Sequence, residues 1–251
     1  MRIVGLEIGR IMTQRSVLDG GDGAVLFPVP SWLIEHRDGL VLFDTGMHAS
    51  LQDSVERIGA DTASRFTPDF EAGEEVAARL DERAIRASDI THVVFSHLHF
   101  DHAGGTNELP DARIVVQRAE WQAGHDQRLI DHGVYNPADY DLGHDVQQVD
   151  GKHDVFGDQR IVCIPTPGHT KGHQSLRVEL DSGPVVLTGD CVYTETQFDD
   201  MSVPAFTSPK AAALQIESMR KLRALRDDHG CQLLFGHDEA QFRALPAEGL
   251  T

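Results

Sequence analysis

The chain has 251 residues, of which 40% are hydrophobic and 25% are charged, so its composition is that of a globular protein and excludes disordered and fibrous classes. Acidic residues outnumber basic residues by 40 to 22, giving a formal charge of −18. This charge argues against binding to nucleic acid or to an anionic membrane surface, since both need clustered Lys and Arg. No apolar run approaches the roughly 18 residues of a membrane-spanning helix.

Targeting and redox signals are also sparse. Glu7 and Arg10 interrupt the apolar N-terminal segment, which lacks a small-residue cleavage pattern, so we do not expect a signal peptide. The cysteines, Cys163, Cys191 and Cys231, form no disulfide framework, and a reducing cytoplasm is the expected location. The unusual count is histidine, with 14 residues, several of them close together in the sequence.

The hydrophobic pattern predicts many strands and few helices. Strands are predicted over residues 2–8, 24–36, 40–44, 90–96, 113–117, 160–166, 174–180, 184–190 and 231–237. Helices are predicted over residues 71–86, 118–129 and 209 to about 229. Residues 130–153 are polar and irregular, as in a loop or lid.

The last helix has the clearest boundaries, because Ser208 supplies an N-cap, Pro209 the first helical position and Gly230 the end. Strands and helices do not alternate regularly along the chain, which disfavours a doubly wound parallel sheet. No linker rich in Pro or Gly divides the sequence. We therefore predict a single α/β domain over residues 1–251, built as an αββα sandwich of two sheets flanked by helices.

Residues that bind metals follow several of the predicted strands. His97, His99, Asp101 and His102 lie directly after the strand that ends at Ser96. In an extended segment His97 and His99 point the same way, because side chains alternate, and the turn that follows lets Asp101 and His102 face a second point. Taken alone, this cluster is equally compatible with a solvated loop.

Three later residues complete a larger set, since His169, Asp190 and His237 each follow a strand and a glycine. Imidazole and carboxylate donors without thiolate suit two divalent ions such as zinc, iron, manganese or cobalt. Such a donor set leaves open coordination positions, as in catalytic rather than structural metal sites. The alternative interpretation is a set of unrelated polar loops.

The sequence resembles the metallo-β-lactamase superfamily, whose signature is HxHxDH followed by a distant His, a bridging Asp and a last His. The resemblance extends from Asp44-Thr45-Gly46 to Gly236-His237-Asp238. Within the superfamily the chain is most similar to the N-acyl homoserine lactonases. The matching segments are SHLHFDHAGG (96–105), IVVQRAEW (114–121), TPGHTKGHQSL (166–176) and SGPVVLTGD (182–190), together with Tyr193.

The resemblance implies a role for each member of the metal-binding set. The ligands of the first metal would be His97, His99 and His169. The ligands of the second would be Asp101, His102 and His237, and Asp190 would bridge the two ions. Zinc is the expected metal, with iron, manganese or cobalt as alternatives.

Other residues near the motifs are expected to act indirectly or not at all. Asp44 would orient a ligand imidazole from behind. His173 is either a donor that supports a ligand or a buried structural histidine, and the second interpretation is preferred. Cys191 is interpreted as a buried, inert thiol. The remaining histidines are expected at the surface: His36, His48, His92, His125, His132, His144, His153 and His229.

The resemblance implies a hydrolase that opens the lactone ring of N-acyl homoserine lactones, which are quorum-sensing signals. A hydroxide shared by the two metals would attack the carbonyl, because metal binding lowers the pKa of water to about 7. Asp101 would carry a proton to the leaving alkoxide, and Tyr193 would donate to the carbonyl oxygen. The alternative for Tyr193 is a buried phenol bonded to backbone. Candidate side chains for an acyl-chain cleft are Met12, Phe27, Trp32, Phe66, Phe70 and Phe206.

Several rival functions share this fold. Hydrolysis of other lactones, aryl esters or phosphotriesters differs only in the pocket walls and stays open, as does assembly into a homodimer. A glyoxalase II-like thioesterase is disfavoured because no basic C-terminal segment is present, and a nuclease is disfavoured by the charge of −18. A β-lactamase is disfavoured by the bridging carboxylate Asp190. A di-iron redox module is disfavoured because it would carry Glu in place of a histidine ligand in the first motif. A non-catalytic binding protein is disfavoured because it would have lost at least one ligand, whereas all seven are present.

Overall fold

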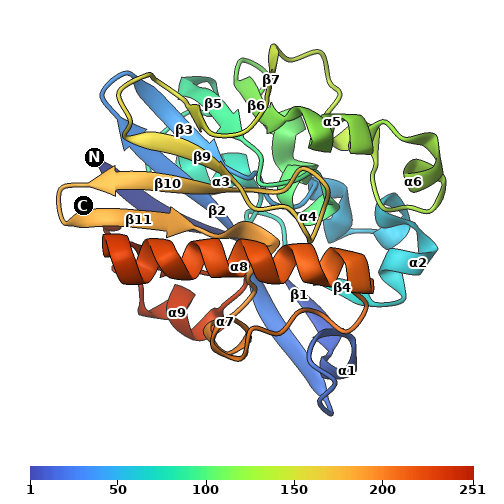
Figure 1. The fold of residues 1–251 in the computed structure, drawn as a ribbon. Helices are drawn as coiled ribbons and strands as arrows, with labels where there is room; N and C mark the ends of the chain where they lie inside the picture. The colour runs from blue at the N-terminus through green and yellow to red at the C-terminus, as the bar shows by residue number, and fades with distance from the viewer.

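The computed structural model describes residues 1–251 and consists of two stacked β-sheets with helices on both outer faces (Figure 1). One sheet has seven strands in the order β4-β1-β2-β3-β5-β6-β7, and the other has five in the order β12-β11-β10-β9-β8. The predicted αββα sandwich is therefore confirmed. No helix combines the length and the apolar character that crossing a bilayer would require.

The boundaries of the elements are as follows. The seven-stranded sheet contains β1 (Arg2–Gln14), β2 (Ala24–His36), β3 (Gly39–Phe43), β4 (Phe66–Asp69), β5 (Ile90–Val94), β6 (Arg113–Gln117) and β7 (Val146–Val149). The five-stranded sheet contains β8 (His153–Asp154), β9 (Ile161–Pro165), β10 (Gln174–Leu180), β11 (Gly183–Leu187) and β12 (Gln232–Leu234). The helices are α1 (Arg15–Leu18), α2 (Gly59–Ala63), α3 (Val76–Asp81), α4 (Phe100–Ala103), α5 (Arg118–Gly124), α6 (Gln127–Asp131), α7 (Glu195–Asp200), α8 (Pro209–His229) and α9 (Glu239–Ala244).

Alternation of side chains along the strands divides the apolar interior into layers. Val41 and Phe43 of β3 face the five-stranded sheet, where they share a core with Leu176 and Leu187. Leu42, between them, faces the opposite way into a core formed with the helices on the outer face of the large sheet. A third core lies beneath α8, which runs along the outer face of the five-stranded sheet (Figure 1).

Two predicted helices are shorter than expected. Within residues 71–86 only α3 is helical, because the side chains of Glu74 and Glu75 accept hydrogen bonds from backbone N–H groups in a turn before it. Ala84, at φ 58°, adopts a left-handed conformation that cannot continue the helix. The predicted helix 118–129 is divided into α5 and α6, because Asp126 caps a new helix by accepting from the N–H of Arg128.

Three edge strands were not predicted: the two-residue strand β8 of the five-stranded sheet, and β4 and β7 at the two edges of the seven-stranded sheet. β4 contains Pro68, and β7 contains Gln147 and Gln148, so neither of these two has the apolar pattern of a strand. Both gain their strand conformation from a neighbour, β4 from β1 and β7 from β6. Residues 130–153 are therefore not a continuous loop.

The sheet topology brings several loops to one end of the sandwich. The strands β3 and β5 are parallel neighbours, and so are β11 and β12. Parallel neighbours end at the same edge of a sheet, which places the segments that follow these four strands together. Six of the seven candidate metal-binding residues lie in the segments after β5, β11 and β12, and His169 lies in the segment after β9.

Candidate metal centre

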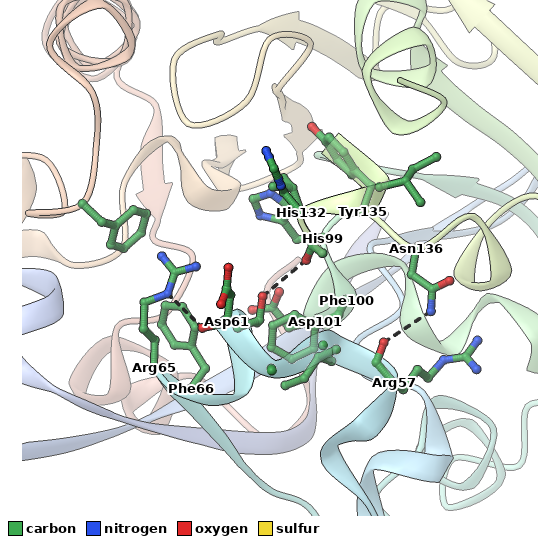
Figure 2. Close-up of a pocket in the computed structure, with 18 of the residues that line it drawn as sticks. Arg57, Asp61, Arg65, Phe66, His99, Phe100, Asp101, His132, Tyr135 and Asn136 are labelled. Carbon is green, nitrogen blue, oxygen red and sulfur yellow. Dashed lines mark hydrogen bonds between the residues drawn. The ribbon is translucent and has the colours of Figure 1, made fainter. Parts of the chain in front are cut away.

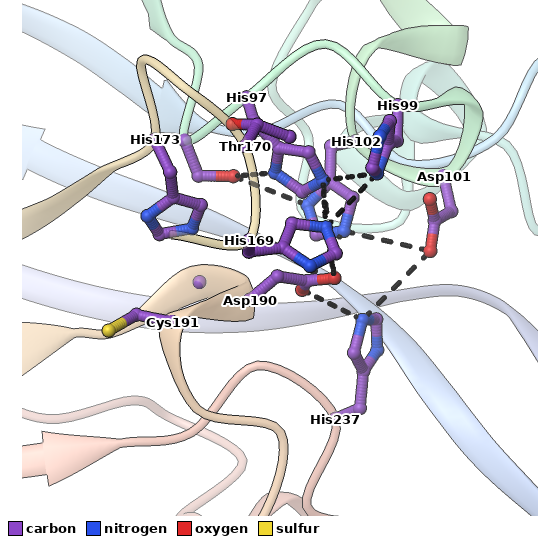
Figure 3. Close-up of polar contacts among 12 residues, drawn as sticks. His97, His99, Asp101, His102, His169, Thr170, His173, Asp190, Cys191 and His237 are labelled. Carbon is purple, nitrogen blue, oxygen red and sulfur yellow. Dashed lines mark hydrogen bonds and ion pairs between the residues drawn. The ribbon is translucent and has the colours of Figure 1, made fainter. Parts of the chain in front are cut away.

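All seven residues predicted to bind metal meet in one site (Figure 3). Their ligand atoms form three overlapping groups, each with every atom within 4.8 Å of the others. These groups are His97 with His99 and His169, His97 with His102 and Asp190, and Asp101 with His102 and His237.

The first group consists of three imidazoles whose nitrogens face one another. The Nε2 atom of His97 lies 2.9 Å from Nδ1 of His99 and 3.2 Å from Nε2 of His169, and the last two atoms are 3.1 Å apart. The Ser96 hydroxyl donates to a carboxylate oxygen of Asp44 at 2.7 Å, so toward Nδ1 of His97, at 2.9 Å, it acts as an acceptor. The proton of His97 therefore sits on Nδ1, which leaves Nε2 with a free lone pair facing the group.

The two imidazoles of the second group, His102 and His237, are also oriented by hydrogen bonds from Nδ1. The Asp44 carboxylate accepts from Nδ1 of His102 at 2.8 Å, as predicted, and it also accepts from the backbone N–H of Ser96. Nδ1 of His237 donates to the carbonyl oxygen of Pro28 at 2.8 Å. Both imidazoles therefore turn Nε2 toward the carboxylates and are held through Nδ1, as metal-binding histidines normally are.

Asp190 lies between the two groups. Its Oδ1 is 3.2 Å from Nε2 of His102 and 3.0 Å from Nε2 of His237, while its Oδ2 is 3.3 Å from Nε2 of His169. Neither Oδ1 of Asp190 nor Nε2 of His102 has a hydrogen-bond partner, although both are buried. The amide of Gln215 on α8 donates to the backbone carbonyl of Asp190 and fixes the turn that carries it.

Burial and neighbouring charge shift the pKa values across the site in two directions. Burial lowers the pKa of His97 and His169 well below the usual value and that of His99 to about 4, so these imidazoles are neutral at pH 7. Burial acts the same way on His102 and His237, but the negative charge of the nearby aspartates outweighs it and raises the pKa of both imidazoles.

The residues fit the divalent metals that the sequence predicts. Three neutral imidazoles that turn nitrogen atoms toward one another, and a buried carboxylate oxygen without a donor, are unfavourable unless a cation lies among them. Five His and two Asp are borderline and hard ligands, which zinc, iron, manganese and cobalt accept. The donor set also divides into two groups joined by Asp190, which suits a pair of ions.

A cavity of about 720 Å³ opens onto this site (Figure 2). Asp101, Asp190 and Tyr193 are part of its lining, together with His99, His169 and His237. The side chain of Tyr193 is buried, and its ring centroid lies 5.1 Å from that of His237. Burial, then the charges of Asp190 and Asp101, raise the pKa of its phenol well above 10, so the phenol keeps its proton at neutral pH.

The candidate acyl-contacting residues divide into two sets. Phe27, Phe66 and Phe206 line the cavity, and the rings of Phe66 and Phe206 pack edge to face. Trp32 and Phe70 are instead buried in the apolar cores, and Met12 is exposed but is not part of the lining, so the prediction for these three is wrong. Met12 and Trp32 lie on strands whose side chains alternate between core and surface, Phe70 directly follows β4, and the sequence does not show which strand end borders the cavity.

Most other histidines lie outside the site. His173 is buried, as predicted, and its Nδ1 donates to the carbonyl oxygen of Thr166. The surface prediction for His36 is wrong, because only 8% of this residue is exposed. Its ring stacks on Phe156 and its Nε2 donates to Asp158. The others are exposed or half-buried: His48, His92, His125, His132, His144, His153 and His229. Cys191 is buried and free, as predicted.

Several residues that shape the site were not predicted from the sequence. Ser96 and the carbonyl group of Pro28 orient candidate ligands, Gln215 fixes the turn of Asp190, and Glu120 binds two segments that carry candidate ligands. Ser96 directly precedes the first motif, which is a signal that the sequence offered. The other three act through contacts between distant segments, and no local pattern marks them.

The class of protein follows from comparison with known families. Residues 24–237 match the family model described as the metallo-beta-lactamase superfamily. The chain therefore belongs to this superfamily.

Within the superfamily, individual relatives show that the chain belongs to the family of the N-acyl homoserine lactonases. The chain is 31% identical to N-acyl homoserine lactonase AttM of Azorhizobium caulinodans, over 88% of this chain and 86% of the relative. It is 30% identical to N-acyl homoserine lactonase AiiA of Bacillus thuringiensis subsp. kurstaki, over 94% and 92%. A solved N-acyl homoserine lactone hydrolase, with N-hexanoyl-L-homoserine bound at its catalytic metal centre, superposes with a TM-score of 0.86 at 27% identity, over 98% of this chain and 96% of that chain.

Proposed function

We propose that this chain hydrolyses the lactone ring of N-acyl homoserine lactones at a centre of two divalent metal ions, most simply zinc. The observation that carries the proposal is the lining of the cavity. Metal-binding groups, the carboxylate of Asp101 and the protonated phenol of Tyr193 border the same space, which is large enough for a drug-sized ligand. Relatives and structural neighbours that are named for this activity support the same conclusion.

His97, His99 and His169 would hold one ion, Asp101, His102 and His237 the other, and Asp190 would contact both. When bound, such a pair supplies hydroxide from water at neutral pH and polarises the carbonyl group that is attacked. The protein itself fixes the ligands, through Ser96, Asp44 and the Pro28 carbonyl, so that little reorganisation accompanies the reaction.

Tyr193 would stabilise the charge that develops on the carbonyl oxygen. Its phenol keeps its proton at neutral pH and can therefore donate a hydrogen bond. A preorganised donor of this kind contributes a few kcal/mol to the transition state. The backbone of Tyr193 is held independently, since its N–H donates to Gln197 and its carbonyl accepts from the N–H of His237.

Asp101 would transfer a proton to the leaving oxygen. Hydrolysis joins a water oxygen to the carbonyl carbon, breaks the bond from that carbon to the ring oxygen, and leaves an alkoxide that needs a proton. Oδ2 of Asp101 lies 3.6 Å from Nε2 of His102 and 3.9 Å from Nε2 of His237, and the residue lines the cavity. A carboxylate in this position can accept a proton from water and pass it to the alkoxide.

The test is a substrate panel on zinc-loaded protein, with kcat/KM measured for acyl homoserine lactones, other lactones, aryl esters, a phosphotriester and a glutathione thioester. The proposal predicts that acyl homoserine lactones exceed the best non-lactone substrate by at least about tenfold. His169→Ala should abolish this activity, and His229→Gln, at an exposed histidine on α8, should retain it. A preference for an ester, triester or thioester would contradict the proposal.

A further inference from the structure

Glu120, in the first turn of α5, is a fully buried carboxylate that plays no part in the mechanism above. Its Oε1 accepts from the backbone N–H of Leu98 at 3.2 Å and from the Tyr135 hydroxyl at 2.9 Å. Its Oε2 accepts from the Thr170 hydroxyl at 2.7 Å and from the backbone N–H of Gly172 at 3.0 Å. No basic side chain pairs with it.

A buried carboxylate without a cation is costly, so its partners indicate what it does. Leu98 lies between the ligands His97 and His99, and Thr170 directly follows the ligand His169. One carboxylate therefore joins the two segments that carry all three ligands of the first group. The contact with Gly172 is so close that a Cβ atom there would lie 2.1 Å from the backbone nitrogen of Glu120.

The second group of ligands is anchored elsewhere. Asp44 orients His102, and the carbonyl of Pro28 orients His237. Neither anchor contacts Glu120. Tyr135, the remaining partner of Glu120, lines the cavity, and its ring centroid lies 5.5 Å from that of His99 (Figure 2).

We propose that Glu120 is a positioning residue that holds His97, His99 and His169 in their ligand geometry and so sets the zinc affinity of that group alone. The inference rests on the two-metal centre of the proposed function. It goes further because it assigns to the first group a support, Glu120, that the second group does not share.

Glu120→Gln tests this proposal because each carboxylate oxygen of Glu120 accepts from one backbone N–H and one hydroxyl. Whichever way the amide is turned, its NH₂ group faces one backbone N–H, either that of Leu98 or that of Gly172. The hydroxyls of Tyr135 and Thr170 can rotate to accept a hydrogen bond, but a backbone N–H cannot. One ligand-carrying segment therefore loses its anchor, and loss of such support typically weakens metal binding by about 10- to 100-fold.

The measurement is the zinc affinity, obtained by competition with a chelator, in two variants that each retain only one of the two ligand groups. His237→Ala leaves the first group intact, and His169→Ala leaves the second intact. Adding Glu120→Gln should weaken zinc binding by about 10- to 100-fold in the first background and by less than about twofold in the second. Tyr135→Phe, which removes one hydroxyl donor and neither backbone donor, and Glu217→Gln, at an exposed carboxylate on α8, should change neither affinity.

The outcomes separate this inference from the function on which it rests. If the unmodified chain binds fewer than two zinc ions, the two-metal centre is wrong. If it binds two zinc ions, the positioning role is wrong when Glu120→Gln lowers the zinc affinity equally in both backgrounds or in neither. It is also wrong when Tyr135→Phe lowers the zinc affinity of the His237→Ala background as much as Glu120→Gln does. Should Glu120→Gln fail to fold, Thr170→Val removes one hydroxyl from the same carboxylate, and a smaller weakening confined to the first group is expected. Equal weakening of both groups by Thr170→Val would overturn the inference.

Discussion

Replacing Tyr193 with phenylalanine removes one hydroxyl group and preserves the ring that packs between His169 and His237. The backbone hydrogen bonds of Tyr193 do not involve the phenol, so the loop and the ligand His237 should keep their positions. The loss of one preorganised donor from a buried site lowers the rate by roughly 10- to 1,000-fold, or about 1.4 to 4 kcal/mol in activation free energy.

The assay for Tyr193→Phe is kcat/KM on an acyl homoserine lactone, followed by the proton that each ring opening releases, with zinc content measured in the same preparation. Lactone turnover should fall within that range while zinc content is unchanged. Activity on an aryl ester with a good leaving group should fall less, because its reaction needs less help from the donor. Undiminished lactone turnover, or an equal loss on every substrate together with lost zinc, would refute the role of Tyr193 and the assignment to acyl homoserine lactones.

Further predictions concern the other parts of the site and the fold. Asp101→Asn should lower kcat by at least about 100-fold with both metals bound, because an amide cannot accept the proton; wild-type kcat in the metal-loaded variant would show that the proton travels elsewhere. Removing metal with a chelator should lower the melting temperature, because the converging donors of the centre lose their cation, and zinc should restore it; an unchanged melting temperature would argue against metal binding there. Burial raises the pKa of Asp139 to about 6, although Arg57 lowers it. The Asp139 carboxyl therefore binds its proton more tightly in the folded protein than in the unfolded chain. Its contribution to the free energy of unfolding is present at low pH and falls as the pH rises from about 4 to about 6. Relative to Asp139→Asn, the wild-type free energy of unfolding should fall by on the order of 3 kcal/mol over that interval in denaturant titrations, and a difference that stays constant with pH would contradict the shift.

The parts of the fold that the sequence predicts well carry their own local signals. The helix α8 begins and ends where Ser208, Pro209 and Gly230 indicate. The strands over residues 113–117 and 174–180 also match, because their apolar pattern is continuous or alternating. The convergence of the ligands follows from the same kind of signal, since each ligand segment comes directly after a strand and strand ends meet at one edge of a sandwich.

The parts that could not be predicted depend on contacts between distant segments. The strand β4 forms only because β1 lies beside it, and this pairing places Phe66, but not Phe70, at the cavity. Glu120 looks like an ordinary acidic residue in the first turn of a helix, where a solvated position is the usual one. Its partners lie 15 to 52 residues away in the sequence, so its burial and its contacts with the ligand segments emerge only in the folded chain.

The most direct test of the central claim is a titration of metal-free protein with zinc while the ring opening of an acyl homoserine lactone is followed. The two-metal centre predicts that activity reaches its plateau at two zinc ions per chain and that the second ion is required for most of it. A plateau at one ion per chain, or no lactone hydrolysis at any zinc concentration, would contradict the account.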